Sequence, residues 1–374
     1  MCKDIDVRAI SVWLLILFLG ETAASTLFAN AAVADATNPA CNPVGLYTCT
    51  LPFPSNFYSV PDSSKPTGIR LNIPEAAIRA ELLKDVPKSI NVQKIANNSS
   101  GFSAASAVLF ELDQAADEKT LPLNGENAVY AFDLDSGAAI PVRAQVNHYA
   151  RSKRVSSPSH IVEIFPRSRW AYGSRIVVAL TNHLKPKAGG NYQPTNGFSQ
   201  ALHDDSSELH NAYRESLKLL EEKGIARDSL ISATYFTVRT EDEVTQPMRK
   251  VMQQTLAAEH PIRNVKTYYQ TFGPVAAYVK GEVRVLDWRN TDGLVDYTLI
   301  PRESWLRFRL SLPRSASNKS APILIYGHGL SVFKETDFTV SFTNAIHGIA
   351  TLSIDQPNHG TRIRSDGGYV FNLL

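Results

Sequence analysis

Two short stretches near the carboxyl terminus hold the residue types of a catalytic loop. The first, His328-Gly329-Leu330, follows the apolar run APILIYG, and the second, from Asp355 to His359, follows the apolar run IATLSI. Histidine, carboxylate and glycine gathered in loops are residue types that acyl transfer uses around a nucleophile. The stretches therefore raise the question of where a nucleophile lies.

The elements around these stretches predict a βαβ unit. APILIYG is a continuous apolar run ending in glycine, as expected of a strand buried on both faces of a parallel sheet. Residues 328–348 have the length of a crossover helix, with Gly348 as its stop, and IATLSID (residues 349–355) is a second buried strand. Both polar stretches then lie at the carboxyl ends of strands, where such sheets place their chemistry. The alternative is two tight turns without chemistry.

The pair of motifs YGHGL and DQPNHG resembles the bacterial extracellular lipases and esterases of the α/β-hydrolase fold. The sequence resembles in particular the virulence-factor-lipase type, which carries an extra N-terminal immunoglobulin-like β region. Three upstream segments are similar to that N-terminal region: LPFPSNFY, GFSAASAVLFEL and VEIFPRSRWAYGSRIVVALT. The resemblance covers most of the mature chain expected after signal removal, with its sharpest motifs in the last 60 residues or so.

The resemblance implies roles for a few residues. In that family the residue after His-Gly donates a backbone N–H to the oxyanion hole, a role that falls on Leu330. Gly329 lets the backbone approach the substrate closely. His328, Asp355 and His359 are expected to organise the loops rather than to transfer protons. The resemblance implies no cofactor and no metal.

The nucleophile itself has no candidate in the sequence. The family's order places a G-x-S-x-G turn on the next strand, followed by the acid and the histidine. The nearest matches, GFSAA at Gly101 and GFSQA at Gly197, lack the final glycine and precede the expected oxyanion loop. The family's next βα unit would begin near Leu374, so the sequence corresponds to a C-terminally truncated member that we expect to be inactive alone.

The acids Asp287, Asp292 and Asp296 are a candidate calcium-binding loop, with less support than the two loop motifs above. Their spacing has one residue too many for an EF-hand, and a hairpin turn explains the TDG within this stretch at least as well. We therefore predict no metal site.

The N-terminus is typical of an exported protein. Residues 9–20, AISVWLLILFLG, form an uncharged apolar run followed by small residues that offer cleavage after Ala31 or Ala34. We predict a signal peptide at residues 1–34 and a secreted, periplasmic or cell-surface location. An uncleaved anchor is the alternative, although a membrane span normally needs about 20 apolar residues. We expect no transmembrane span after signal removal.

Signal removal also removes Cys2 and leaves Cys41 and Cys49 in CNPVGLYTC. An even pair in an exported protein indicates a disulfide, with two free thiols as the alternative. The formal net charge of +2 over 374 residues argues against nucleic acid as a partner.

The rest of the chain predicts an α+β region followed by an α/β region. Residues 35–100 are rich in Pro, Ser and Asn and predict an irregular segment. Residues 101–190 hold five apolar, partly alternating runs separated by turn residues, which predict an antiparallel, sandwich-like, immunoglobulin-like β domain. Residues 198–260 are expected to be helical, and residues 265–374 are expected to form the first part of an α/β-hydrolase domain.

Within the helical region, one amphipathic helix is predicted over residues 201–224, ending at Gly224. Its apolar face comprises Leu202, Leu209, Tyr213, Leu217 and Leu220. A second helix follows Thr240, where Pro247 predicts either a later start near Thr245 or a kink.

Two functions fit these features. The first is an exported serine carboxylic-ester hydrolase acting on a small-molecule or lipid ester. The alternative is an exported, non-catalytic binding or surface protein with a vestigial hydrolase half.

Overall fold

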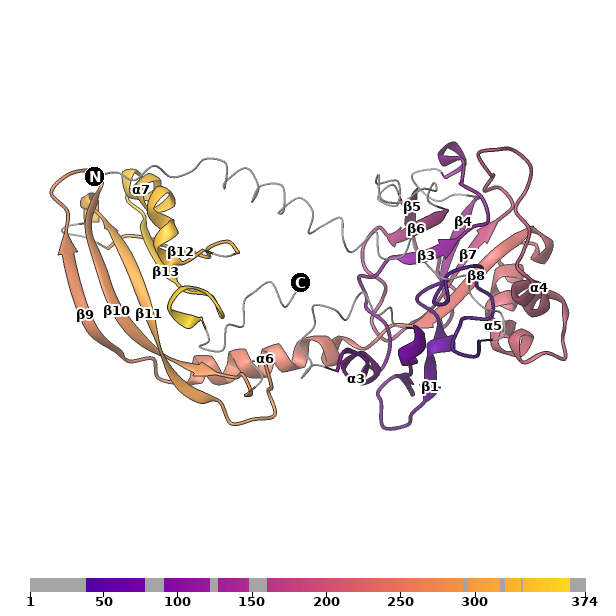
Figure 1. The fold of residues 1–374 in the computed structure, drawn as a ribbon, viewed down its shortest axis with the longest axis horizontal. Coiled ribbons are helices and arrows are strands. Elements are labelled where there is room, and N and C mark those ends of the chain that lie inside the picture. Colours follow the sequence, from indigo (N-terminus) through magenta and orange to yellow (C-terminus); the bar gives the residue numbers. More distant parts are fainter. Residues whose placement is uncertain are drawn as a thin grey trace. The chain divides into compact units, whose positions relative to one another are not determined.

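The computed structural model describes residues 38–77, 91–121, 127–147, 160–291, 295–316, 320–330 and 332–363. The expected signal peptide lies outside the described residues. The chain divides into two compact units, the first reaching Val244 and the second continuing from Thr245. The fold is mixed α+β, with several sheets and few helices (Figure 1).

Two three-stranded antiparallel sheets form the centre of the first unit. One has the order β3 (Val108–Glu111), β6 (Ile161–Pro166) and β5 (Val142–Val146), and the other has β4 (Val129–Asp133), β7 (Arg175–Thr181) and β8 (Leu230–Thr237). The five strands expected within residues 101–190 are all present, and β8 joins them from beyond that range.

Strand β7 explains how the first unit is layered. Its even-numbered residues Ile176, Val178 and Leu180 belong to the core that contains residues of both sheets together with Trp170. Its odd-numbered residues Val177 and Ala179 belong to a second core shared with the helices. Because both faces of β7 are covered, the strand is apolar along nearly its whole length rather than alternating.

The helices of the first unit differ from the predicted single helix. The structure has α4 (Asn196–His203) and α5 (Glu208–Glu222), so one continuous helix over residues 201–224 is wrong. The side chain of Ser207 accepts a hydrogen bond from the His210 N–H and starts the second helix. Gly224, at φ +80°, ends α5 as expected. Because α4 and α5 share a core with β7, the expected β domain and most of the helical region form one unit.

The segment expected to be irregular contains short elements. They are β1 (Ser59–Pro61) and β2 (Ile69–Leu71), which pair antiparallel, and α3 (Val92–Asn97). Leu51 and Tyr58 are fully buried, so this segment contributes to the core of the unit. A disulfide joins Cys41 to Cys49 and closes the loop between them.

The second unit contains a five-stranded sheet with the order β12-β13-β11-β10-β9. The bounds are β9 (Ile262–Tyr269), β10 (Val275–Asp287), β11 (Arg302–Pro313), β12 (Ile323–Tyr326) and β13 (Ala350–Ile354). Only β12 and β13 run parallel, and every other neighbouring pair is antiparallel. Figure 1 shows β9, β10 and β11 lying side by side as long strands.

Helix α7 (Phe338–Ile346) connects β12 to β13 and packs against β13 and β11. Gly348, at φ +73°, follows it, which confirms the predicted βαβ unit and its stop. Two details differ from the prediction. Of the residues 328–348 expected to form the crossover helix, α7 covers only Phe338–Ile346. In addition, β12 lies at the edge of the described sheet, and Ile325 is 75% exposed rather than buried.

Helix α6 (Glu241–Ala257) contains the point of division between the units, and Pro247 lies inside it. It starts earlier than Thr245, with the Thr240 hydroxyl accepting from the Glu243 N–H at 3.4 Å.

Candidate functional site

Because β12 and β13 pair in parallel, the two polar loops that follow them lie at the same end of the sheet, where both strands finish. Ile325 lies opposite Leu352 and Tyr326 opposite Ser353, so His328 and Asp355 each follow the strand end by one or two residues. The carboxyl ends of adjacent parallel strands are where open sheets bind ligands. The structure therefore brings together the two stretches that the sequence singled out.

His328 joins the two loops. Its Nε2 accepts a hydrogen bond from the Gln356 N–H at 2.9 Å, and its Nδ1 lies 2.9 Å from the Gly329 carbonyl oxygen. Because Nε2 accepts, Nδ1 must carry the proton and donate to that carbonyl. Both ring nitrogens of His328 thus bond to backbone groups, one in each loop.

Asp355 is the most heavily bonded group of the second loop. It is 1% exposed and accepts from the backbone N–H and the Nζ of Lys334, both at 2.8 Å. It also accepts from the backbone N–H and the hydroxyl of Thr361, at 2.9 and 2.7 Å. Burial alone would raise the pKa of this carboxyl, but the hydrogen bonds from Lys334 and Thr361 outweigh burial and hold the pKa well below its usual range.

These bonds tie two short helices to the end of β13. Lys334 begins η7 (Lys334–Asp337) and Thr361 lies in η8 (Gly360–Arg362). Gly360 has φ +51°, and a Cβ on this residue would stand 2.3 Å from an oxygen of Asp355. Only glycine therefore permits the carboxylate to lie against the loop.

His359 is buried beside His328, with their ring centroids 4.9 Å apart. Its Nδ1 lies 2.8 Å from the Pro357 carbonyl oxygen, and its Nε2 has no hydrogen-bond partner among the described residues. The Oδ1 of Asn358, a residue with φ +60°, also lacks a partner within the described chain. Two buried acceptors are thus unsatisfied in one loop, and such groups cluster at functional sites.

A second buried ion pair supports the loops and was missed from the sequence. Arg309 Nη1 lies 3.0 Å from Asp337 Oδ1, and the Ser353 hydroxyl donates to Asp337 Oδ2 at 2.8 Å. Burial raises the pKa of Asp337, and the hydrogen bond and the arginine charge oppose it only in part. An arginine between apolar residues of a strand, RFRL at residues 307–310, is the sequence signal that could have indicated this pair.

Leu330 and Gly329 form the open side of the first loop. Leu330 is 49% exposed, and its N–H bonds to no acceptor in the part of the chain that the structure describes. A Cβ on Gly329 would meet nothing nearer than Val332 at 3.9 Å, so protein packing does not require this glycine. The backbone N–H of Leu330 is therefore an unused hydrogen-bond donor on the exposed side of the first loop.

The serines of the two incomplete G-x-S motifs lie in the first unit. Ser103 is exposed in a turn, and Ser199 lies within α4, so neither follows a strand as a nucleophile turn requires. Asp287 is paired with Arg289 at 2.8 Å, and Asp296 accepts from Thr298. Among the described residues, no group of three or more potential metal ligands lies together.

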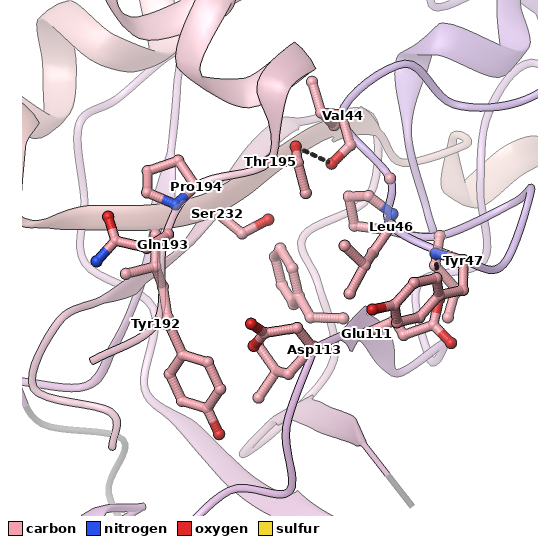
Figure 2. Close-up of a pocket in the computed structure, with 16 residues that line it drawn as sticks. Val44, Leu46, Tyr47, Glu111, Asp113, Tyr192, Gln193, Pro194, Thr195 and Ser232 are labelled. Atoms are coloured by element: carbon pink, nitrogen blue, oxygen red, sulfur yellow. Dashed lines mark hydrogen bonds between the residues drawn. The ribbon is translucent and has the colours of Figure 1, made fainter. Parts of the chain in front are cut away.

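The first unit contains a cavity of about 250 Å³ that sequence reasoning missed. Residues from four separate segments form its walls, among them the disulfide-closed loop and the end of β3 (Figure 2). No local pattern could have indicated it, because the segments are brought together only by the fold.

The chain matches no family model, and no curated protein or solved structure is detectably similar to it. Within the described ranges, no helix combines the length and apolarity that crossing a membrane would need.

Proposed function

We propose that the second unit forms the oxyanion side of an exported serine carboxylic-ester hydrolase of the α/β-hydrolase fold. The observation that carries the proposal is the junction of two loops at parallel strand ends, where His328 Nε2 accepts from the Gln356 N–H at 2.9 Å. The sheet order supports it, because parallel β12 and β13 stand next to antiparallel β11. In this proposal the first unit is the immunoglobulin-like N-terminal β region.

The chemistry needs a donor at the place where negative charge develops. Attack on an ester carbonyl concentrates charge on one oxygen, and a backbone N–H fixed in advance stabilises that oxygen in the transition state. The unused N–H of Leu330 on an exposed loop suits this role. His328 and Asp355 act as positioning residues, since both are buried and occupied by hydrogen bonds to backbone groups.

In the assembled enzyme a serine attacks the ester, the alcohol leaves, and water hydrolyses the acyl-enzyme. We assign that serine to none of residues 1–374, because the sequence contains no G-x-S-x-G turn. The substrate class is a small-molecule or lipid ester, and the location is extracellular, periplasmic or at the cell surface. The Cys41–Cys49 disulfide supports an oxidising compartment.

The test compares Leu330→Pro with Leu330→Ala in the native exported protein. Proline removes the N–H while alanine retains it, so Leu330→Pro should lower kcat for a short-chain nitrophenyl ester about 10²–10³-fold. Leu330→Ala should stay within a fewfold of wild type. Equal effects of the two substitutions, or a native protein without ester hydrolysis, would reject the proposal.

The intact mass of the native protein completes this test. A mass well above the 41.2 kDa of the present sequence would leave room for the serine, the acid and the histidine. A non-catalytic binding role is the second candidate function, and the cavity of the first unit favours it.

A further inference from the structure

The cavity in the first unit has a chemical character that points to a ligand. Its walls include residues 44–47 of the disulfide loop, residues 110–113 at the end of β3, and residues 192–195 before α4. Figure 2 shows Asp113, Tyr47, Tyr192 and Ser232 around the hollow. All these segments belong to the first unit, so the cavity is independent of the hydrolase-like loops.

One carboxylate of the cavity wall is structural. Glu111 accepts from the backbone N–H groups of Tyr47 and Thr48 at 3.0 and 2.6 Å, and from the Thr48 hydroxyl at 3.0 Å. These bonds anchor the loop closed by Cys41 and Cys49 against β3. The Tyr47 and Thr48 groups that donate to Glu111 are neutral. They hold the disulfide-closed loop in place, but they do not neutralise the negative charge of Glu111.

The other carboxylate in the cavity wall, that of Asp113, has no bonding partner in the described part of the chain. Its side chain forms no hydrogen bond or ion pair with any residue that the structure describes. None of the 16 lining residues is Lys, Arg or His. The cavity therefore carries negative charge with no cation among its walls, and it disfavours an anionic ligand.

Three aromatic residues accompany this carboxylate. Tyr47 is exposed on the rim, while Phe110 and Tyr192 are buried. The Tyr192 hydroxyl donates to the Gln114 carbonyl oxygen at 3.1 Å, which leaves the ring as the part that lines the hollow. Burial, and then the charges of Asp113 and Asp117, raise the pKa of Tyr192, so the ring stays neutral. Aromatic faces next to a carboxylate attract organic cations.

We propose that this cavity binds a compact organic ammonium group, held by the Asp113 carboxylate and by the rings of Tyr47, Phe110 and Tyr192. The volume of about 250 Å³ suits one small head group, since it lies below the range of about 300–1,000 Å³ typical of sites for drug-sized ligands. A methylated ammonium and a primary amine share this chemistry. The proposal stands whether or not the second unit supports ester hydrolysis.

The test measures binding to the full chain by isothermal titration calorimetry, with three probes. Tetramethylammonium and methylammonium carry the charge, whereas tert-butanol resembles tetramethylammonium in size and is neutral. We expect at least one cation to bind tenfold or more tightly than tert-butanol. The tighter of the two cations shows whether the natural ligand is methylated or primary. Equal binding of the neutral probe, or no binding of either cation, would overturn the proposal.

Two matched substitutions locate the binding. Asp113→Asn should weaken cation binding about tenfold, whereas Asp228→Asn, which removes an exposed carboxylate of the same unit outside the cavity, should leave it unchanged. Both positions are exposed, so both variants should keep the wild-type melting temperature. Cation binding that survives Asp113→Asn, or that falls equally in both variants, would contradict a site at this cavity.

Discussion

The two units are stabilised by different kinds of buried side chain. In the first unit, β7 is covered on both faces and large apolar residues such as Trp170, Phe236 and Leu217 fill two cores. In the second unit, polar residues of η7 and β13 are fully buried, namely Asp337, Thr351 and Ser353, beside apolar residues such as Phe308 and Ala350. The first unit is thus built mainly by apolar packing, and the second builds its loops with charges and hydroxyls.

The difference extends to the surface. Apolar residues of the second unit remain exposed, including Ile325 on β12 and Phe338 and Phe342 on α7. Buried ion pairs give little net stability but are costly to break singly, because the remaining charge stays without a partner. The buried charged and hydroxyl groups of the second unit therefore specify loop geometry more than they add stability.

The largest effect is expected from breaking the apolar core of the first unit. Trp170 is fully buried, packs edge-to-face on Phe236 with centroids 5.6 Å apart, and donates from its indole nitrogen to the Ser106 carbonyl oxygen at 2.8 Å. Trp170→Ala should lower the free energy of unfolding by about 3–5 kcal/mol, because it leaves a large cavity.

Urea unfolding followed by circular dichroism measures this loss. Tyr269→Ala, at a side chain that is 84% exposed, is the control and should change the free energy by less than about 0.5 kcal/mol. A Trp170→Ala loss below about 1 kcal/mol would show that apolar packing does not dominate the first unit.

The βαβ unit could be predicted because each of its signals is local. An apolar run, a glycine stop at Gly348 and a second apolar run specify strand, helix and strand without reference to the rest of the chain. The five strands within residues 101–190 were predictable for the same reason. Local signals failed at residues 201–224, where the apolar spacing continues through the turn before Ser207 and hides the break between α4 and α5.

Partners far apart in the sequence were not predictable. The pairing of Arg309 with Asp337 and of Lys334 with Asp355 depends on how η7 packs against the sheet, which no spacing rule reveals. Strand β9, whose residues are all exposed, has no buried face to create a pattern. The same limit applies to Asp113, since the cavity that gives it a role is formed by four separate segments.

An intermediate effect is expected from removing a buried carboxylate of the second unit. Asp355→Asn takes away the nearer carboxylate of Lys334 Nζ, at 2.8 Å, and leaves this nitrogen Glu335 at 3.3 Å. Because the Lys334 side chain is only 6% exposed, the substitution should lower the free energy of unfolding of this unit by about 3 kcal/mol. Because the folded-state pKa of Asp355 is lowered, its stabilising contribution is fully present above the unfolded pKa of about 4 and declines as pH falls from there to the folded-state pKa. The difference in melting temperature between wild type and variant should therefore be constant from pH 7 to pH 5 and begin to narrow below about pH 4.

The double variant Asp355→Asn/Lys334→Met separates pairing from packing. It also removes the positive charge of Lys334, so it should recover part of the stability lost in Asp355→Asn. If the single variant is as stable as wild type at pH 7, the carboxylate does not hold the loops together.

The smallest effect is expected from a single methyl group at the loop that Asp355 supports. Gly360→Ala places a Cβ within 2.3 Å of the carboxylate and also strains a backbone at φ +51°, so it should cost about 1–3 kcal/mol. Gly190→Ala is the matched control in the first unit: its φ is +87°, but no atom lies within 4 Å of the added Cβ. Thermal melts of both variants measure the difference. An excess loss in Gly360→Ala means that close contact with a buried charge, rather than backbone strain alone, shapes this loop, whereas equal losses would place the whole cost in the backbone.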